Sequence, residues 1–456
     1  MKIILEKKEI GHDFEKFIGA VWILSILYFL ILGIVFWDRF TNRSLYFTNF
    51  IATIAYLSFL FFSAGGRSFR QPKLIGLVLA YNFFFVAAYN ALFFLDHGNF
   101  LAFQSMDSAT YHYIAEHITR SYFVDTLSSF PWYIGNDDKG FVIYASLLYR
   151  IIPSNLTLNF FNILLNLATT ILIYRLGRFI FSSKGAFLAA LIFGCATYTV
   201  FYQASGLKET LMVFLTVGGF YYFIQSSEKG SLPLFFLGLL FCVLLTFFRV
   251  PIAFFTLISV GIYLFFKRKR ESMLAPLVLI LSVFIGILFF LLFRKYLPHY
   301  TLSFIDILFY KESLIETNIQ FASAVSMVAG FFGPFPTIIP FPGKENSSIF
   351  AGSLILKVFI SAYFFVGTYF SYKNKSAIGI AITVFCLLEI GSLCYLLETL
   401  ELRKSIPHML FFVLLAVYGF ENIEKLGSQY KSLKRIILTG NIGFAGVIFA
   451  WNTLRF

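Results

Sequence analysis

Long apolar runs alternate with short polar segments along the chain. A helical run of about 20 apolar residues crosses roughly 30 Å of hydrocarbon. Backbone N–H and C=O groups must bond internally in lipid, so each run is expected to be a helix. The strands of a β-barrel are shorter and alternate in polarity, unlike these continuous runs. About thirteen transmembrane helices are predicted, at 17–37, 45–64, 74–95, 157–176, 185–202, 208–225, 232–248, 250–266, 273–293, 352–372, 376–397, 406–420 and 436–452.

Composition agrees with this pattern. The 456 residues are 59% hydrophobic and 13% charged, and the mean hydropathy is +0.81. These values are far from those of a soluble domain, so we predict an all-α polytopic membrane protein. The first run has no small-residue cleavage pattern after it, and we interpret it as a retained helix. All four cysteines lie inside apolar runs without metal-ligand spacing, which favours a packing role.

The basic residues give the expected orientation. The net charge is +13, but Lys and Arg gather in the short loops that the predicted spans place on one side of the membrane, such as Lys267–Arg270. This distribution is typical of cytoplasmic loops and not of a nucleic-acid partner. We therefore predict the N-terminus inside and, with an odd number of spans, the C-terminus outside. A bacterial inner (plasma) membrane fits best, with the functional face toward the periplasm or exterior.

Two long polar segments, 96–140 and 295–350, fall on the predicted outer face. The short apolar stretch Phe141–Ile152 ends at Pro153 and predicts a juxtamembrane or re-entrant helix. Leu302–Val328 predicts an amphipathic interfacial helix followed by a loop. Five segments result: 1–95 with three spans, 96–156 as first outer loop with juxtamembrane helices, 157–294 as central helices, 295–351 as outer helix and loop, and 352–456 as C-terminal helices.

Asp107 is the first candidate for chemistry. A carboxylate in an outer loop beside Tyr111 and His112 suits a base that accepts a proton from a sugar hydroxyl. The alternative is a helix cap at the start of the predicted helix Ala109–Thr119. His112 and Glu116 are four residues apart and share a helix face. They are therefore candidates for a divalent metal site, and a solvated contact between them is the alternative.

Lys208 and Glu209 stand at the outer end of an otherwise apolar run. Adjacent helical residues point about 100° apart, so neither neutralises the other. Two ionisable groups at such a place favour a water-filled cavity over snorkelling to the interface. Farther into their own runs, Lys357 and Glu389 lie at similar predicted depth, and we expect them to form an ion pair that organises packing.

Cations also mark two outer helix entrances. Arg249 precedes Pro251 between two runs, and Arg403 precedes Pro407 and His408. Guanidinium groups bind phosphate oxygens through paired hydrogen bonds, so both sites suit a lipid-phosphate headgroup. Contact with membrane phospholipid is the open alternative. The same predicted face carries Glu398 and Glu401.

The order of these elements resembles the GT-C superfamily of polyprenyl-phosphate-sugar-dependent glycosyltransferases. The resemblance is to the branch with protein mannosyltransferases and the lipid A aminoarabinose transferase. It is carried by four stretches over about residues 75–420: Asp107-Ser-Ala-Thr-Tyr111-His112, the helical run Leu158–Phe181, Ser205-Gly-Leu-Lys-Glu-Thr-Leu, and Arg403-Lys-Ser-Ile-Pro407.

The resemblance implies a sugar donor on a lipid carrier such as undecaprenyl phosphate, and an acceptor that is a glycan, lipid or protein. Asp107 is then the base for inverting transfer, and Glu209 orients substrate or holds a metal. The implied substrate-binding residues are Tyr111, His112, Lys208, Arg249, Arg403 and His408. Metal dependence stays open, with Asp107, His112, Glu116 and Glu209 as candidate ligands.

Two other function classes remain. A polymerase or ligase for O-antigen or exopolysaccharide joins preassembled glycans from a diphosphate carrier, and it would depend more on Arg249 and Arg403 than on Asp107. A lipid-linked glycan flippase or transporter would line a path through the bilayer with paired charges, of which only Lys357 and Glu389 are predicted deep.

Overall fold

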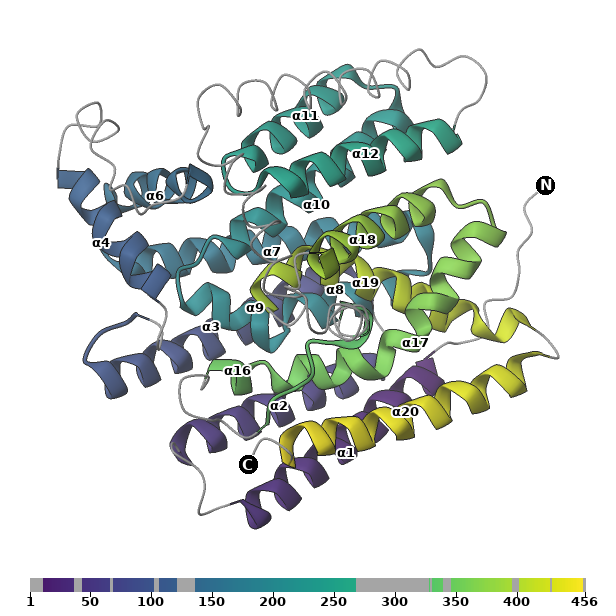
Figure 1. Ribbon diagram of the computed structural model, residues 1–456. Helices are drawn as coiled ribbons and strands as arrows, with labels where there is room; N and C mark the ends of the chain where they lie inside the picture. The colour runs from purple at the N-terminus through teal and green to yellow at the C-terminus, as the bar shows by residue number, and fades with distance from the viewer. Residues whose placement is uncertain are drawn as a thin grey trace, which may run out of the picture. The chain divides into compact units, whose positions relative to one another are not determined.

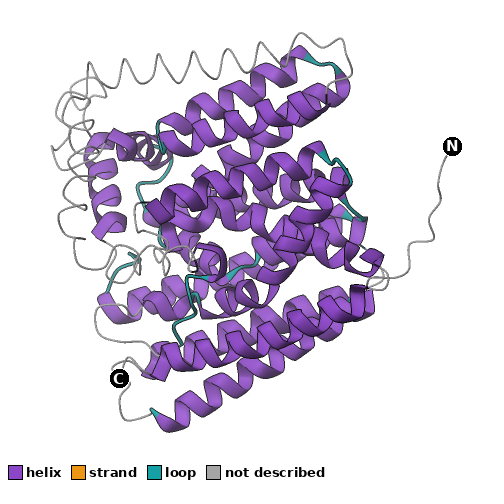
Figure 2. Cartoon of the chain, turned by 45° about the vertical axis from the view of Figure 1, so that its right-hand side comes forward, coloured by secondary structure: helices purple, strands orange, loops and turns teal. Residues whose placement is uncertain are grey.

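The computed structural model describes residues 11–36, 43–65, 69–101, 106–120, 136–267, 328, 330–338, 346–395, 402–426 and 429–453. Every regular element within these ranges is a helix, as Figure 2 shows. Nine helices of the described part are long and apolar enough to cross a membrane. They are α1 (Gly11–Val35), α2 (Arg43–Ala64), α3 (Gln71–His97), α7 (Asn155–Ile180), α12 (Val250–Lys267), α17 (Ala351–Lys373), α18 (Ala377–Tyr395), α19 (Leu402–Asn422) and α20 (Gln429–Thr453). The protein is therefore an all-α polytopic membrane protein, as predicted.

The remaining predicted spans differ in detail. The run 185–202 is broken into α8 (Ser183–Gly194) and α9 (Thr197–Ala204), which are bent by 46° and make a tenth span if counted together. The runs 208–225 and 232–248 form α10 (Glu209–Lys229) and the shorter apolar α11 (Leu232–Thr246). The run 273–293 lies outside the described residues. The count of thirteen and the orientation stay predictions.

The predicted outer segments are described only in part. The helix expected at Ala109–Thr119 is α4 (Met106–Arg120), and the juxtamembrane helix is α6 (Asn136–Tyr149), which begins earlier than predicted. In the second segment, the short helix α16 (Asn346–Ile349) precedes α17. The amphipathic helix expected at Leu302–Val328 falls almost wholly outside the described residues.

The chain divides into two compact units. The first comprises Met1–Phe214, Phe335–Gly367 and Val413–Phe456. Within it α20 runs beside α1 (Figure 1), and the Tyr28 hydroxyl donates to the Ala445 carbonyl.

Buried amides join α3, α7 and α9 inside this unit. The side chain of Asn82 donates to the carbonyl of Gly194 and accepts from Gln203 and Asn166. Nearer the start of α7, Asn159 donates to Asn90 at 2.9 Å. Such bonds satisfy polar groups that lipid leaves unpaired, so they fix α9 against α7.

The second unit comprises Leu215–Pro334 and Thr368–Phe412. Its helices α11 and α12 form a hairpin, and α12 packs along α18. Rings from three helices meet in its core: the Phe411 centroid lies 4.7 Å from that of Phe220 and 4.9 Å from that of Phe385. These contacts hold α18 and α19 against α10.

Candidate functional site

Asp138 is the centre of a polar cluster in the first unit. Its Oδ1 lies 2.5 Å from Nζ of Lys208 and accepts a hydrogen bond from the Tyr111 hydroxyl at 2.6 Å. The Lys208 side chain is 7% exposed and that of Asp138 is 27% exposed. Because the ammonium is nearly buried, this carboxylate offsets part of the free-energy cost of burying its charge. The cluster thus joins α4, α6 and the segment between α9 and α10.

The start of α4 is tied to the same segment. Ser108 is buried, and its hydroxyl donates to the carbonyl of Ser205 at 2.6 Å. Asp107 precedes Ser108 in the first turn of α4, where a carboxylate is stabilised by the helix dipole. Since α4 begins at Met106, Asp107 lies inside the helix and not before it. This hydrogen bond brings the first turn of α4 to the break that precedes Lys208.

The break between α9 and α10 has a local cause. Gly206 has φ +62°, a left-handed conformation that glycine adopts without steric cost. A Cβ at Gly206 would lie 2.6 Å from Oδ1 of Asn155, so the position also has no room for a side chain. Ser205-Gly206-Leu207-Lys208 therefore turns against α7, and α10 starts at Glu209, which is 1% exposed.

The water-filled cavity expected around Lys208 and Glu209 stays a prediction, and the structure gives Lys208 a carboxylate partner. Asp138, which lies 70 residues before Lys208 in the chain, carries the opposite charge that pairs with it. The adjacent Glu209 was not expected to pair with Lys208. Sequence reasoning missed Asp138, which lies in the same first-turn acidic run as Asp137. The sequence shows that Lys208 needs a counter-charge and that Asp137 and Asp138 are adjacent acids, but the helix start was predicted too late in the chain and no spacing connects these acids with Lys208.

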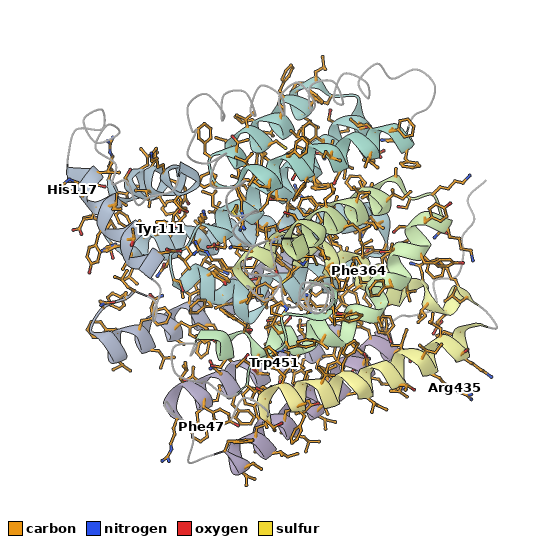
Figure 3. The ribbon with its side chains drawn as sticks, viewed as in Figure 1. Phe47, Tyr111, His117, Phe364, Arg435 and Trp451 are labelled. Carbon is orange, nitrogen blue, oxygen red and sulfur yellow. The ribbon has the colours of Figure 1, made fainter. Side chains whose placement is uncertain are left out.

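His112 links α4 to α6. Its Nδ1 lies 2.8 Å from the hydroxyl oxygen of Tyr149, and its Nε2 lies 3.9 Å from Oε2 of Glu116. Burial lowers the pKa of His112, and the charge of Glu116 acts in the opposite direction. Figure 3 shows Tyr111 toward the interior of this region and His117 at the outer end of α4. We therefore leave His117 out of the candidate site.

The candidate metal ligands do not form a ready-made centre. Across the ranges that the structure describes, no three His, Cys, Asp or Glu side chains gather as a metal-binding group. His112 and Glu116 approach each other, but the other ring nitrogen of His112 contacts Tyr149. A divalent metal stays an expectation.

The second unit holds the other predicted substrate-binding residues. Arg249 lies in the break before α12, and Arg403 is half-buried in the first turn of α19. His408 is fully buried, with its Nδ1 3.8 Å from Oε1 of Glu389 on α18. Glu389 also interacts electrostatically with Arg249. The partner that the structure gives Glu389 within this unit is thus His408, while the expected pair with Lys357 stays a prediction.

The structure therefore groups the predicted site residues in two places. Tyr111, Lys208 and the first turn of α4 with Asp107 come together in the first unit, next to Glu209. Arg249 and His408 come together around Glu389 in the second. Glu398 and Glu401 lie outside the described residues.

A model of the dolichyl-phosphate-mannose-protein mannosyltransferase family matches residues 143–293, about one third of the chain. The matched segment includes Lys208, Glu209 and Arg249, and it begins after Asp107 and Asp138. No curated protein matches the chain. The family match supports a GT-C superfamily glycosyltransferase, and hence a multi-pass membrane enzyme that uses a lipid-linked sugar donor.

Proposed function

We propose that this protein transfers a sugar from a polyprenyl-phosphate donor to a glycan, lipid or protein acceptor, with inversion at the anomeric carbon. We place the reaction on the outer face of a bacterial inner (plasma) membrane. Nucleotide sugars are cytoplasmic, so a reaction on that face requires a donor delivered on a lipid. The alternatives, a diphosphate-dependent polymerase or ligase and a flippase, have no specific observation in their favour.

One observation carries the proposal: the Asp138 cluster stands beside the start of α4. It holds a nearly buried lysine next to a helix turn that bears a half-buried carboxylate, Asp107. Sugar transfer from a lipid phosphate requires two groups: a fixed cation that stabilises the phosphate and a carboxylate that accepts the proton of the acceptor hydroxyl.

In the proposed mechanism Asp107 accepts the proton of the acceptor hydroxyl while its oxygen attacks the anomeric carbon. The bond between that carbon and the phosphate oxygen breaks, and its electron pair stays on the departing polyprenyl phosphate. Lysine and arginine stabilise the charge that develops on this leaving group. We assign this role to Lys208, and Arg249 and Arg403 remain phosphate-binding residues expected from the sequence.

The remaining residues have orienting roles. Asp138 holds the ammonium of Lys208 and the hydroxyl of Tyr111 in one place. Glu209, buried at the start of α10, orients substrate. A divalent ion, where bound, would neutralise phosphate charge, and His112 with Glu116 are the side chains best placed to hold one.

The test uses the purified full chain in nanodiscs with a radiolabelled polyprenyl-phosphate sugar and a panel of acceptors. We expect lipid-linked label to move to an acceptor, and NMR of the product to show the anomeric configuration opposite to that of the donor. A polyprenyl-diphosphate oligosaccharide is the comparison donor. Transfer from the diphosphate donor alone would support the polymerase or ligase, and retention of configuration would overturn the mechanism.

A further inference from the structure

A basic surface lies where α3 begins and where α7 passes into α8, in the first unit. It is at the end of α7 opposite to the turn at Gly206, which contacts the start of that helix. The proposed mechanism uses none of its cations. Four of them are exposed and Lys184 is half-buried: Arg70, Lys73, Arg175, Arg178 and Lys184.

An aromatic ring organises this surface. The ring of Phe69, just before α3, lies 4.8 Å from Nζ of Lys184 and meets the Phe187 ring edge-on at 5.4 Å between centroids. A cation over an aromatic face is attracted by the negative charge density of that face. The Phe69 carbonyl also accepts a hydrogen bond from the Tyr174 hydroxyl at 3.2 Å. The segment before α3 is therefore held against both α7 and α8.

Two exposed guanidinium groups on α7 adjoin these contacts. Nε of Arg175 donates to Oε1 of Gln71 at 3.3 Å, and a terminal nitrogen of Arg178 donates to the Ser183 hydroxyl. In the part of the chain that the structure describes, both acceptors are neutral oxygens, and neither arginine forms an ion pair. A guanidinium has five N–H donors, so each arginine is fixed by one donor and retains others that suit a phosphate.

The carboxylate of Glu421 approaches this surface but serves the start of α8. It accepts hydrogen bonds from the backbone N–H of Ser182, at 3.2 Å, and from the Ser182 hydroxyl. The same hydroxyl oxygen accepts from the N–H of Gly185 at 3.0 Å. Glu421 thus balances the positive end of α8 and does not pair with the two arginines. An anion at this surface would be bound by side-chain cations and not by the helix end.

The exposed side of α7 that leads to the arginines is apolar. Phe160 and Leu164 precede Arg175 by nearly whole helical turns, so they lie on its side of the helix, and they are 44% and 39% exposed. Phe179, one turn after Arg175, is 41% exposed. Since α7 is long and apolar enough to span a membrane, its arginine end lies at a membrane surface in either orientation. A soluble anion would contact only the cations, whereas a phospholipid matches both parts of this side.

We propose that this surface binds an anionic phospholipid, with its phosphate on Arg175 and Arg178 and its acyl chains along the exposed side of α7. The other three cations raise the positive potential around the headgroup. A zwitterionic phospholipid carries an equivalent phosphate, but its ammonium group would be repelled by this surface. The inference goes beyond the proposed function and does not depend on it.

The experiment measures binding of two fluorescently labelled lipids to the full chain in detergent micelles. They are phosphatidylglycerol and phosphatidylcholine with identical acyl chains. We expect the wild type to prefer phosphatidylglycerol. The double variant Arg175→Gln/Arg178→Gln should bind phosphatidylglycerol more weakly by a factor on the order of ten and phosphatidylcholine unchanged.

The matched control is Lys431→Gln/Arg435→Gln. It removes two exposed cations one turn apart near the start of α20, in the same unit. Its preference for phosphatidylglycerol should equal that of the wild type. Equal weakening by the control and by the α7 variant would show a general attraction to positive charge, and would overturn the site.

Three further outcomes would also overturn it. They are a wild type without preference between the lipids, a preference that persists in Arg175→Gln/Arg178→Gln, and displacement of labelled phosphatidylglycerol by inorganic phosphate at matched ionic strength. The last would assign the surface to a soluble anion. If the glutamine variant does not fold, Arg175→Lys/Arg178→Lys replaces it, because lysine loses the planar fork of donors. Weakening specific to phosphatidylglycerol would then support the proposal, and wild-type binding of both lipids would overturn it.

Discussion

The ammonium of Lys208 lies 2.5 Å from the carboxylate of Asp138, although 70 residues separate them. Asp138→Asn removes the charge that balances a nearly buried lysine. We expect thermal unfolding in detergent to show a loss of about 1–3 kcal/mol, below the value for a fully buried pair because Asp138 is partly exposed. Tyr111→Phe, which deletes the hydrogen bond to the same oxygen, should cost about 1 kcal/mol. Equal stability of Asp138→Asn and the wild type would mean that the pair contributes nothing.

Asp107 is expected to act as the base. Asp107→Asn should keep the fold and donor binding but lower turnover by a factor on the order of 10² or more. Asparagine loses only the favourable interaction of the charge with the helix dipole, about 0.3–1 kcal/mol, so the folded variant separates chemistry from helix stability. The measurement is single-turnover transfer with donor affinity determined in parallel. Near-normal transfer by the folded variant would leave Asp107 a purely structural role.

Arg403 is expected at the donor phosphate. Arg403→Lys keeps the charge but loses the planar fork of donors, so it should weaken binding of polyprenyl phosphate. Arg403→Ala should weaken it further, by roughly 2–4 kcal/mol if the contact is desolvated. Affinities of the purified variants in nanodiscs provide the measurement. If all three proteins bind alike, the donor assignment moves to Arg249 and Lys208.

Gly206 is expected to be essential to the break that carries Lys208. Gly206→Ala forces an alanine into a left-handed backbone conformation, which costs about 1–2 kcal/mol, and its Cβ would collide with Oδ1 of Asn155. That amide donates to the Phe100 carbonyl at 2.9 Å, so it does not move freely. Gly230→Ala is the control, because Gly230 has φ +63° but open space around it. Thermal unfolding should show a larger loss of stability for Gly206→Ala than for Gly230→Ala. Equal losses would mean that the collision with Asn155 does not contribute.

The orientation is testable with single cysteines at exposed positions of the described helices. Tyr113→Cys on α4 should react with a membrane-impermeant thiol reagent in intact cells, and Lys229→Cys at the end of α10 should react only after lysis. Background is low because three of the four native cysteines are buried. The reverse pattern would invert the predicted topology and move the reaction to the cytoplasmic face.

The sequence by itself determined the class of fold, because a run of about 20 apolar residues has few alternatives to a membrane helix. It also predicted the helix that follows Asp107, since helix spacing is a local property of the chain. The structure alone showed that the run 185–202 is two helices, because the bend depends on side-chain amides from α3 and α7 that bind the Gly194 carbonyl.

The partners of the charged residues were decided only by tertiary structure. Spacing identified Lys208 and Arg249 as unusual, but no periodicity connects Lys208 with Asp138, or His408 with Glu389. Such pairs depend on which helices pack together, and apolar helix surfaces carry little information about their neighbours. The sequence shows that a buried charge needs a counter-charge, but only the packing of the helices determines which residue provides it.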